Sequence, residues 1–191
     1  IDSVQGAIIP ASAASEFLQG KKGFQFDIYR MPFDEGRGGT PEPVAGASHN
    51  GKSNYFPKVS PDGKWLVFTQ SENFMLLQPD SKLLIVPASG GVAREMRCNT
   101  KNMNSWHSFS PDGRWLVFSS KADGLYTQLW LTHLDEQGND APPVLLSHLR
   151  TPELAANIPE FVAVRPGQLQ QIVDGFSDDG NYHYRIAKTL I

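Results

Sequence analysis

One eleven-residue stretch occurs twice in this chain of 191 residues. SPDGKWLVFTQ begins at Ser60 and SPDGRWLVFSS begins at Ser110, so the two copies lie 50 residues apart and are identical at eight of eleven positions. Self-similarity at a fixed spacing is typical of architectures that stack copies of one small unit. The repeat therefore constrains the fold more than any other feature of the sequence.

Each SPDG tetrapeptide predicts a tight hairpin. Proline presets φ near −65° at the second position of a type I turn, aspartate suits the third position, and glycine takes the positive φ that follows. Such a turn, with a bulge at the glycine, joins two antiparallel strands. We therefore expect a structural role for the residues of both turns, which are Pro61, Asp62, Gly63, Pro111, Asp112 and Gly113.

Strand-like segments surround each hairpin and complete a unit of four antiparallel strands. The segments after the turns are rich in aromatic and β-branched residues, as buried strands are. The predicted strands of the two central units are 55–59, 64–70, 82–88 and 92–98, then 105–109, 114–120, 128–134 and 143–149. No helical periodicity competes with this pattern, so the sequence predicts an all-β fold.

Weaker copies of the unit flank the two central ones. We expect second, third and fourth strands at 6–13, 24–33 and 41–47, and first, second and third strands at 158–164, 170–176 and 183–191. A four-stranded meander cannot bury both of its faces alone, whereas neighbours around an axis cover one another. The chain is therefore predicted to be a single partial β-propeller, with two complete and two incomplete blades at 1–49, 50–99, 100–151 and 152–191.

The motifs FPKVSPDGKWLVFTQ and WHSFSPDGRWLVFSS, each in a unit with a strand such as LWL and a glycine-rich turn, resemble the WD-like repeats of TolB-type propellers. The chain looks like the C-terminal half of a bacterial protein of that family. The resemblance implies a six- or seven-bladed ring that works through binding, in the periplasm or outside the cell. Because three to four blades are too few for a closed ring, we expect a piece of a longer polypeptide or a subunit completed by a second chain.

Composition and motifs argue against most chemistries. A formal net charge of −3 gives no reason to expect nucleic acid as a partner, and no segment is long and apolar enough to span a membrane. Cys98 is the only cysteine, and the five histidines lack metal-ligand spacing, so we expect neither a metal nor a cofactor. Nucleophile-elbow, P-loop and dinucleotide motifs are also lacking. Asp178-Asp179 fits a hairpin turn better than an acid/base pair.

Candidate binding residues lie where the copies differ. The loop at 71–81 carries an apolar run that either packs over a blade or forms an interaction patch. An asparagine precedes each predicted inner strand, and it either shapes the turn between blades or lines the mouth of the central channel. The aromatic-histidine pair of the third unit replaces Phe56-Pro57. The candidates are Asn54, Asn104, Asn157, Trp106, His107, Phe74, Met75 and Leu76.

The leading hypothesis is a non-catalytic propeller module of a bacterial envelope or secreted protein, which binds a protein or a glycan through its irregular loop face. The alternative is the propeller half of a larger enzyme, a serine hydrolase or a haem-containing redox protein, whose catalytic domain lies outside this segment.

Overall fold

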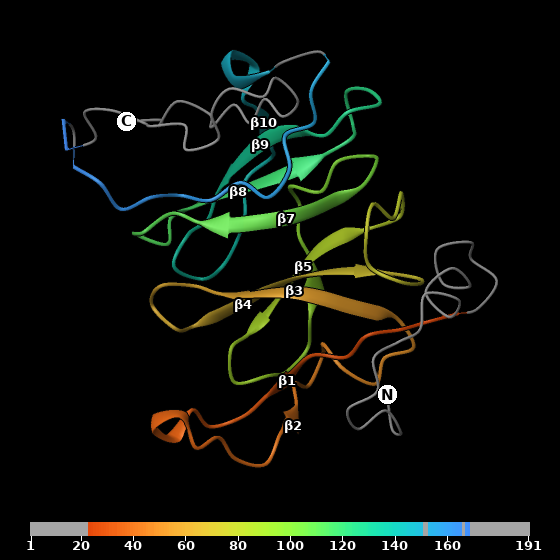
Figure 1. The fold of residues 1–191 in the computed structure, drawn as a ribbon, viewed down its shortest axis with the longest axis vertical. Coiled ribbons are helices and arrows are strands. Elements are labelled where there is room, and N and C mark those ends of the chain that lie inside the picture. Colours follow the sequence, from red (N-terminus) through yellow and green to blue (C-terminus); the bar gives the residue numbers. More distant parts are fainter. Residues whose placement is uncertain (1–22, 151–152, 166, 169–191) are drawn as a thin grey trace, which may run out of the picture.

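The computed structural model describes residues 23–150, 153–165 and 167–168. Two four-stranded antiparallel sheets lie one above the other at its centre, and a two-stranded sheet lies beneath them (Figure 1). The predicted fold class, antiparallel four-stranded blades of a partial propeller, is confirmed. The predicted strands at 6–13, 170–176 and 183–191 and the pair Asp178-Asp179 fall outside the described residues.

Both complete sheets are meanders in chain order. The strands of the second unit are β3 (Ser53–Val59), β4 (Trp65–Ser71), β5 (Lys82–Pro87) and β6 (Arg94–Glu95). Those of the third unit are β7 (Asn104–Phe109), β8 (Trp115–Ser120), β9 (Gln128–His133) and β10 (Val144–Leu145). The first unit contributes β1 (Tyr29–Arg30) and β2 (Glu42–Pro43), with the 3₁₀ turn η1 (Asp34–Gly36) between them, and a second 3₁₀ turn, η2 (Ser147–Leu149), follows β10.

Several strands are shorter than the sequence predicts. The expected third strand at 24–33 is reduced to β1, and the fourth strands at 41–47, 92–98 and 143–149 are reduced to two residues each. In the second unit, the amide N of Cys98 donates to the Asp140 carboxylate at 2.6 Å instead of to the neighbouring strand, so the outer strand ends before it. The expected strand at 158–164 has no strand pairing among the described residues.

Strand β4 shows how the units pack, because its side chains alternate between two separate cores. Leu66 and Phe68 face the first unit, where they meet Ile28 and Val44. Val67 and the partly buried Trp65 belong to the other core, which includes Leu116 and Phe118 of the third unit. The second unit is therefore covered on both faces, as a blade inside a propeller must be.

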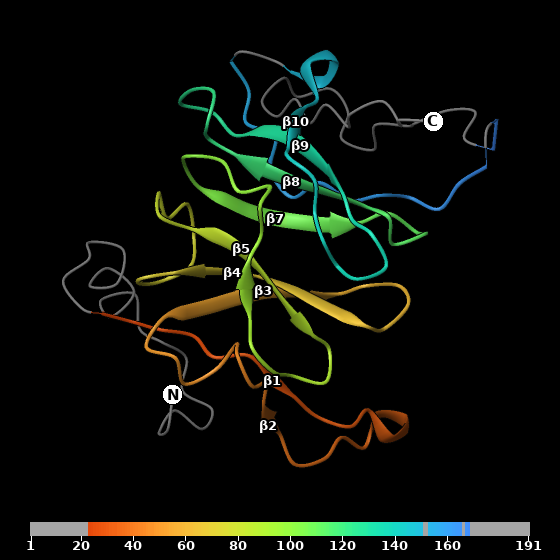
Figure 2. The ribbon, with the colours of Figure 1, turned by 180° about the vertical axis from the view of Figure 1, so that it is seen from behind.

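The meander places two kinds of connection at opposite ends of the sheets. The SPDG turns and the turns between third and fourth strands lie at the left in Figure 1, and the loops 71–81 and 121–127 lie at the right. The view from behind shows the same separation (Figure 2). We call the end with the two loops the loop face and the other end the turn face.

Candidate functional site

The two SPDG turns have matching geometry. In the first, the Ser60 hydroxyl donates to the Asp62 carboxylate at 2.6 Å, and the same carboxylate accepts from the amide N of Lys64 at 3.1 Å. In the second, Asp112 accepts the equivalent bonds, and both glycines have φ of 72°. These hydrogen bonds, led by the serine hydroxyl, lower the pKa of both aspartates. The carboxylates thus close the turns, which contain Pro61, Asp62, Gly63, Pro111, Asp112 and Gly113.

Asn54 and Asn104 lie at the junctions between blades. The amide N of Asn54 donates to the carbonyl of Phe26 in the first unit at 2.7 Å. The backbone N and side-chain Nδ2 of Asn104 both donate to the carbonyl of Ser81 in the second unit, at 3.0 and 3.2 Å. Each asparagine is only 1% exposed, so its side chain joins neighbouring blades and has almost no contact with solvent.

Asn157 repeats this arrangement in part. Its Oδ1 accepts a hydrogen bond from the Thr127 hydroxyl at 2.5 Å, and the amide N of Ala156 donates to the carbonyl of Thr127 at 2.9 Å. The residue is exposed, unlike the two earlier asparagines. The segment after the third unit therefore begins to dock as an inner strand does, although no strand pairing is described in it.

Trp106 and His107 form a bulge in the inner strand. Pairing of β7 with β8 shifts between Ser105 and Ser108, and pairing of β3 with β4 shifts at the equivalent place. Trp106 and its counterpart Phe56 both have positive φ, 48° and 52°, which is uncommon for a large side chain. No local sequence pattern predicts this bulge, because no glycine marks it.

The bulge buries His107, which is 2% exposed. Its Nε2 lies 2.9 Å from the carbonyl oxygen of Val67, which only accepts, so Nε2 carries the proton. Its Nδ1 has no partner among the described residues. Burial is the main reason that the pKa of His107 falls to about 4. The side chain is therefore neutral at pH 7 and faces the second unit, away from solvent.

A polar cluster beside His107 was not predicted from the sequence. The Glu160 carboxylate accepts from the Lys58 ammonium at 2.7 Å and from the Ser108 hydroxyl at 2.6 Å. Burial opposes ionisation of Glu160, but these two hydrogen bonds outweigh it and lower its pKa. Lys58 and Ser108 occupy the same repeat position, 50 residues apart. This equivalence is the sequence feature that could have indicated a shared polar cluster. The cluster joins three consecutive units near the turn face.

The apolar loop at 71–81 divides into an anchored part and an exposed part. The amide N of Phe74 donates to the carbonyl of Phe24 at 2.7 Å, and the Phe74 ring lies 6.5 Å from that of Phe26. Met75 is half-buried, whereas Leu76 and Leu77 are exposed. The loop therefore packs on the first unit through Phe74 and presents its leucines to solvent.

The corresponding loop of the third unit, 121–127, presents a second apolar group. Leu125 is 87% exposed and Tyr126 is also exposed. Asp123 pairs with Arg150 at 2.9 Å, and together they line a small hollow beside these residues. Leu125 and Tyr126 were not among the binding residues predicted from the sequence. The sequence feature that could have indicated them is an apolar pair directly after Asp-Gly in a loop.

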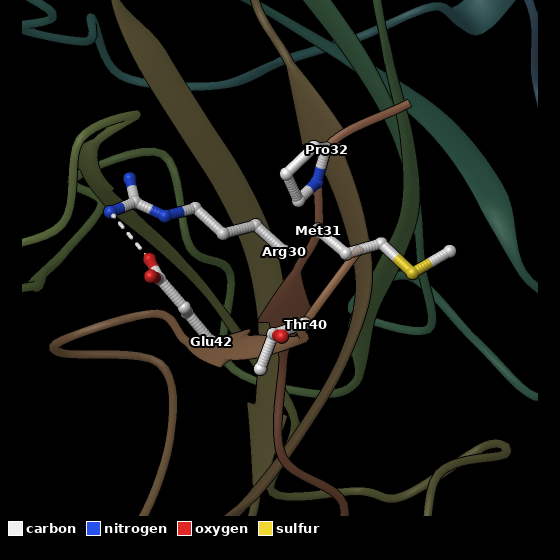
Figure 3. Close-up of a pocket in the computed structure, with 5 residues that line it drawn as sticks. All are labelled: Arg30, Met31, Pro32, Thr40 and Glu42. Carbon is white, nitrogen blue, oxygen red and sulfur yellow. Dashed lines mark ion pairs between the residues drawn. The ribbon is translucent and has the colours of Figure 1, made fainter. Parts of the chain in front are cut away.

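A further open hollow of about 490 Å³ lies on the two-stranded sheet of the first unit. Arg30 and Glu42 line it and pair at 3.6 Å (Figure 3). Arg30 also donates to the carbonyl of Ser89 at 3.1 Å, so its guanidinium ties the first unit to the second. No candidate residue from the sequence lines this hollow.

Neither the acidic residues nor the cysteine forms a recognisable reactive centre in the described ranges. No group of three or more His, Cys, Asp or Glu side chains there could hold a metal ion. Burial, followed by the charge of Asp140, raises the pKa of the Cys98 thiol. Arg94 neutralises Asp140 with an ion pair of 3.3 Å, and the three residues link the outer parts of the second and third units.

No helix within the described residues is long and apolar enough to cross a membrane.

Comparison with known proteins gives matches among solved structures only. No protein-family model matches the chain, and a search of curated proteins found no match. The chain is similar to a protein assigned as TolB from Agrobacterium tumefaciens, with a TM-score of 0.47 and 21% identity over 70% of this chain and 42% of that one. It is also similar to TolB from Acinetobacter baumannii, with a TM-score of 0.45 and 20% identity over 72% and 32% of the two chains.

A third match is to puromycin hydrolase, with a TM-score of 0.48 and 22% identity over 63% of this chain and 20% of that one. The chain thus spans between a fifth and about two fifths of these structures. Two of the three proteins are described as TolB, the family that the repeats of this chain resemble.

Proposed function

We propose that this chain, whose fold is that of TolB-like propellers, is a non-catalytic interaction module that binds a protein partner through its loop face. The observation that carries the proposal is the exposure of apolar side chains on two adjacent loops at one end of the sheets. These side chains are Leu76, Leu77, Leu125 and Tyr126.

The chemistry of these loops suits a protein partner better than a glycan. Burying one leucine against a partner contributes about 1.5–3 kcal/mol, and tyrosine is enriched at protein interfaces. The Asp123–Arg150 ion pair beside Leu125 is the kind of polar group that surrounds an apolar contact. The loop face therefore combines an apolar centre with a charged edge.

The SPDG turns on the turn face offer a contrast that supports the proposal. They are closed by internal hydrogen bonds and are nearly identical in the two units, whereas Phe33 and Val92, in other turns of that face, are exposed. Loops, in contrast, are where binding residues concentrate in proteins with a rigid scaffold. A partner that distinguishes this chain from other propellers has more to recognise on the loop face.

We place the module in a bacterial envelope or secreted protein. The support for this location is the resemblance of its repeats to those of TolB-type propellers. Fractionation of the source cells with an antibody against this chain tests it, because the expected signal is in the periplasmic or extracellular fraction.

Photo-crosslinking tests the binding proposal. A benzoylphenylalanine replacing Leu125 should capture a protein from extract of the source organism, and the same probe at Lys64 on the turn face should not. The captured protein is then purified and titrated against Leu125→Asp, which should raise its dissociation constant at least tenfold. Equal capture at both positions, or unchanged affinity, would contradict the proposal.

The same crosslinking experiment distinguishes this proposal from the alternative, in which the chain is the propeller half of a larger enzyme. Performed on the full gene product, it would give a crosslink within one polypeptide, to a domain outside this segment, if the loop face served a catalytic domain.

A further inference from the structure

The small hollow on the loop face has an unpartnered amide in its wall. Gln128, the first residue of β9, lines this hollow of about 200 Å³ and is only 3% exposed. Its carboxamide makes no hydrogen bond to another described residue. A buried carboxamide is nearly always hydrogen-bonded in folded proteins, and it has two donors as well as an acceptor oxygen. Gln128 therefore offers both a donor and an acceptor to a group that enters the hollow.

The same repeat position in the second unit has no such free group. Lys82 is the counterpart of Gln128, because each is the first residue of the third strand in its unit. The Lys82 ammonium forms an ion pair with Glu95 on the neighbouring strand. The free carboxamide therefore belongs to the third unit alone, beside the loop whose exposed apolar residues carry the proposed function.

An ion pair and two apolar side chains complete the wall of the hollow. Asp123 and Arg150 pair through one oxygen and one nitrogen at 2.9 Å, so their charges cancel. The remaining carboxylate oxygen can still accept a hydrogen bond, and the remaining guanidinium nitrogens can still donate. Leu125 and Tyr126 line the hollow and are exposed. The hollow thus has hydrogen-bonding groups without net charge beside an apolar surface, which suits a neutral ligand that both donates and accepts.

We infer that the partner binds the loop face as an extended peptide, with its backbone on Gln128 and its side chains against Leu125 and Tyr126. The inference rests on the proposed function and adds the way in which the partner is recognised. In an extended segment the N–H and C=O of one residue point to the same side, so one carboxamide bonds to both. Main-chain hydrogen bonds supply affinity in such recognition, and the alternating side chains supply specificity.

An extended peptide accounts for this surface better than a sugar does. Leu125 is 87% exposed, and a sugar ring would bring hydroxyl groups against it, which is unfavourable for groups that lose water without gaining a hydrogen bond. Successive side chains of an extended peptide point to opposite sides of its backbone. Apolar side chains can therefore cover Leu125 and Tyr126 while the backbone between them bonds to Gln128.

Selection of random linear peptides, displayed on phage, against the 191-residue chain tests the inference. It should yield peptides whose dissociation constant rises about tenfold on Gln128→Met, because methionine keeps the length of the side chain and loses its hydrogen bonds. Gln128→Met should melt at or above the temperature of the parent, since the amide has no partner inside the chain. Lys82→Met, at the same repeat position of the second unit, is the matched control and should leave the affinity unchanged. Absence of such peptides, or a Gln128→Met variant that melts lower than the parent, overturns the inference.

Methylation of the peptide's amide nitrogens, one at a time, tests whether Gln128 contacts the backbone. Methylation at one position should weaken binding about tenfold. Combining it with Gln128→Met should weaken binding little further, because both changes remove the same hydrogen bond. Losses that multiply at every position would show that Gln128 does not bond to the backbone, and they would overturn the inference.

Leu125→Asp keeps the test of the proposed function separate. If Leu125→Asp weakens peptide binding and Gln128→Met does not, the loop face binds through its apolar side chains alone, so the proposed function stands and the inference fails. If neither variant weakens binding, both fail. A panel of oligosaccharides is the last arm, and an oligosaccharide whose binding is lost on Gln128→Met would assign the hollow to a glycan and overturn the inference.

Discussion

The second and third units have nearly the same hairpin, but they differ in their inner strands, in their loops and in what covers them. In both, a serine and an aspartate close the SPDG turn through equivalent hydrogen bonds. The bulge holds Phe56-Pro57 in one inner strand and Trp106-His107 in the other. The second unit is covered on both faces, whereas the third has exposed Trp115 and Val144 on one face.

This difference shows which parts of a repeat are constrained by packing. The hairpin and its strand are fixed because their turn geometry and alternating side chains must fit a neighbour on each side. The bulge and the loops at the loop face are free to differ because they lie at the inner edge and the end of the sheet. The residues that distinguish the second unit from the third are therefore concentrated there.

The largest effect is expected from two leucines at the same repeat position. Leu83 is fully buried beneath the third unit, so Leu83→Ala should cost about 2–5 kcal/mol of unfolding free energy. Leu129 is its counterpart and is only half-buried, so Leu129→Ala should cost less than half as much. Urea denaturation measures both. Equal losses would mean that the third unit is covered as fully as the second.

The glycines of the two hairpins should also differ. Gly113→Val forces a β-branched residue to positive φ and should cost about 1–3 kcal/mol. A Cβ there would also lie 3.3 Å from Pro61, whereas a Cβ at Gly63 would meet nothing within 4 Å. Gly63→Val should therefore be the milder change. Thermal melting compares them, and a Gly113→Val variant that melts with the parent would refute the turn assignment.

A pH effect should distinguish the two bulges, because only the third unit has a histidine there. The pKa of His107 is about 4 in the folded protein, below the value near 6.5 of an unfolded histidine. The contribution of neutral His107 to the free energy of unfolding is complete above pH 6.5. It is lost as the pH falls toward 4, because the unfolded chain then binds the proton more readily than the folded protein does. The free energy of unfolding should drop by about 2 kcal/mol between pH 7 and pH 5.

His107→Gln is the control for this pH series. It should flatten the slope between pH 7 and pH 5, while the Glu160 contribution changes mainly at lower pH. A slope equal to that of the parent would show that another group titrates.

The smallest effect on stability is expected at the loop face. Leu76 is exposed, so Leu76→Asp should change the free energy of unfolding by no more than about 0.5 kcal/mol. Phe74→Asp is the matched comparison, because Phe74 packs on the first unit and its loss should destabilise. A Leu76→Asp variant as unstable as Phe74→Asp would mean that the whole loop packs on a blade.

The sequence alone determined the repeat, the two hairpins and the four-stranded unit, because turn chemistry and alternating apolar residues act locally. Only the tertiary structure decided the roles of Asn54, His107 and Glu160, since each depends on a partner in another unit. The asparagine bonds to the preceding blade, a bulge without glycine buries the histidine, and the glutamate pairs with a lysine about a hundred residues away. Such contacts depend on how the blades stack, and no local sequence pattern predicts this stacking.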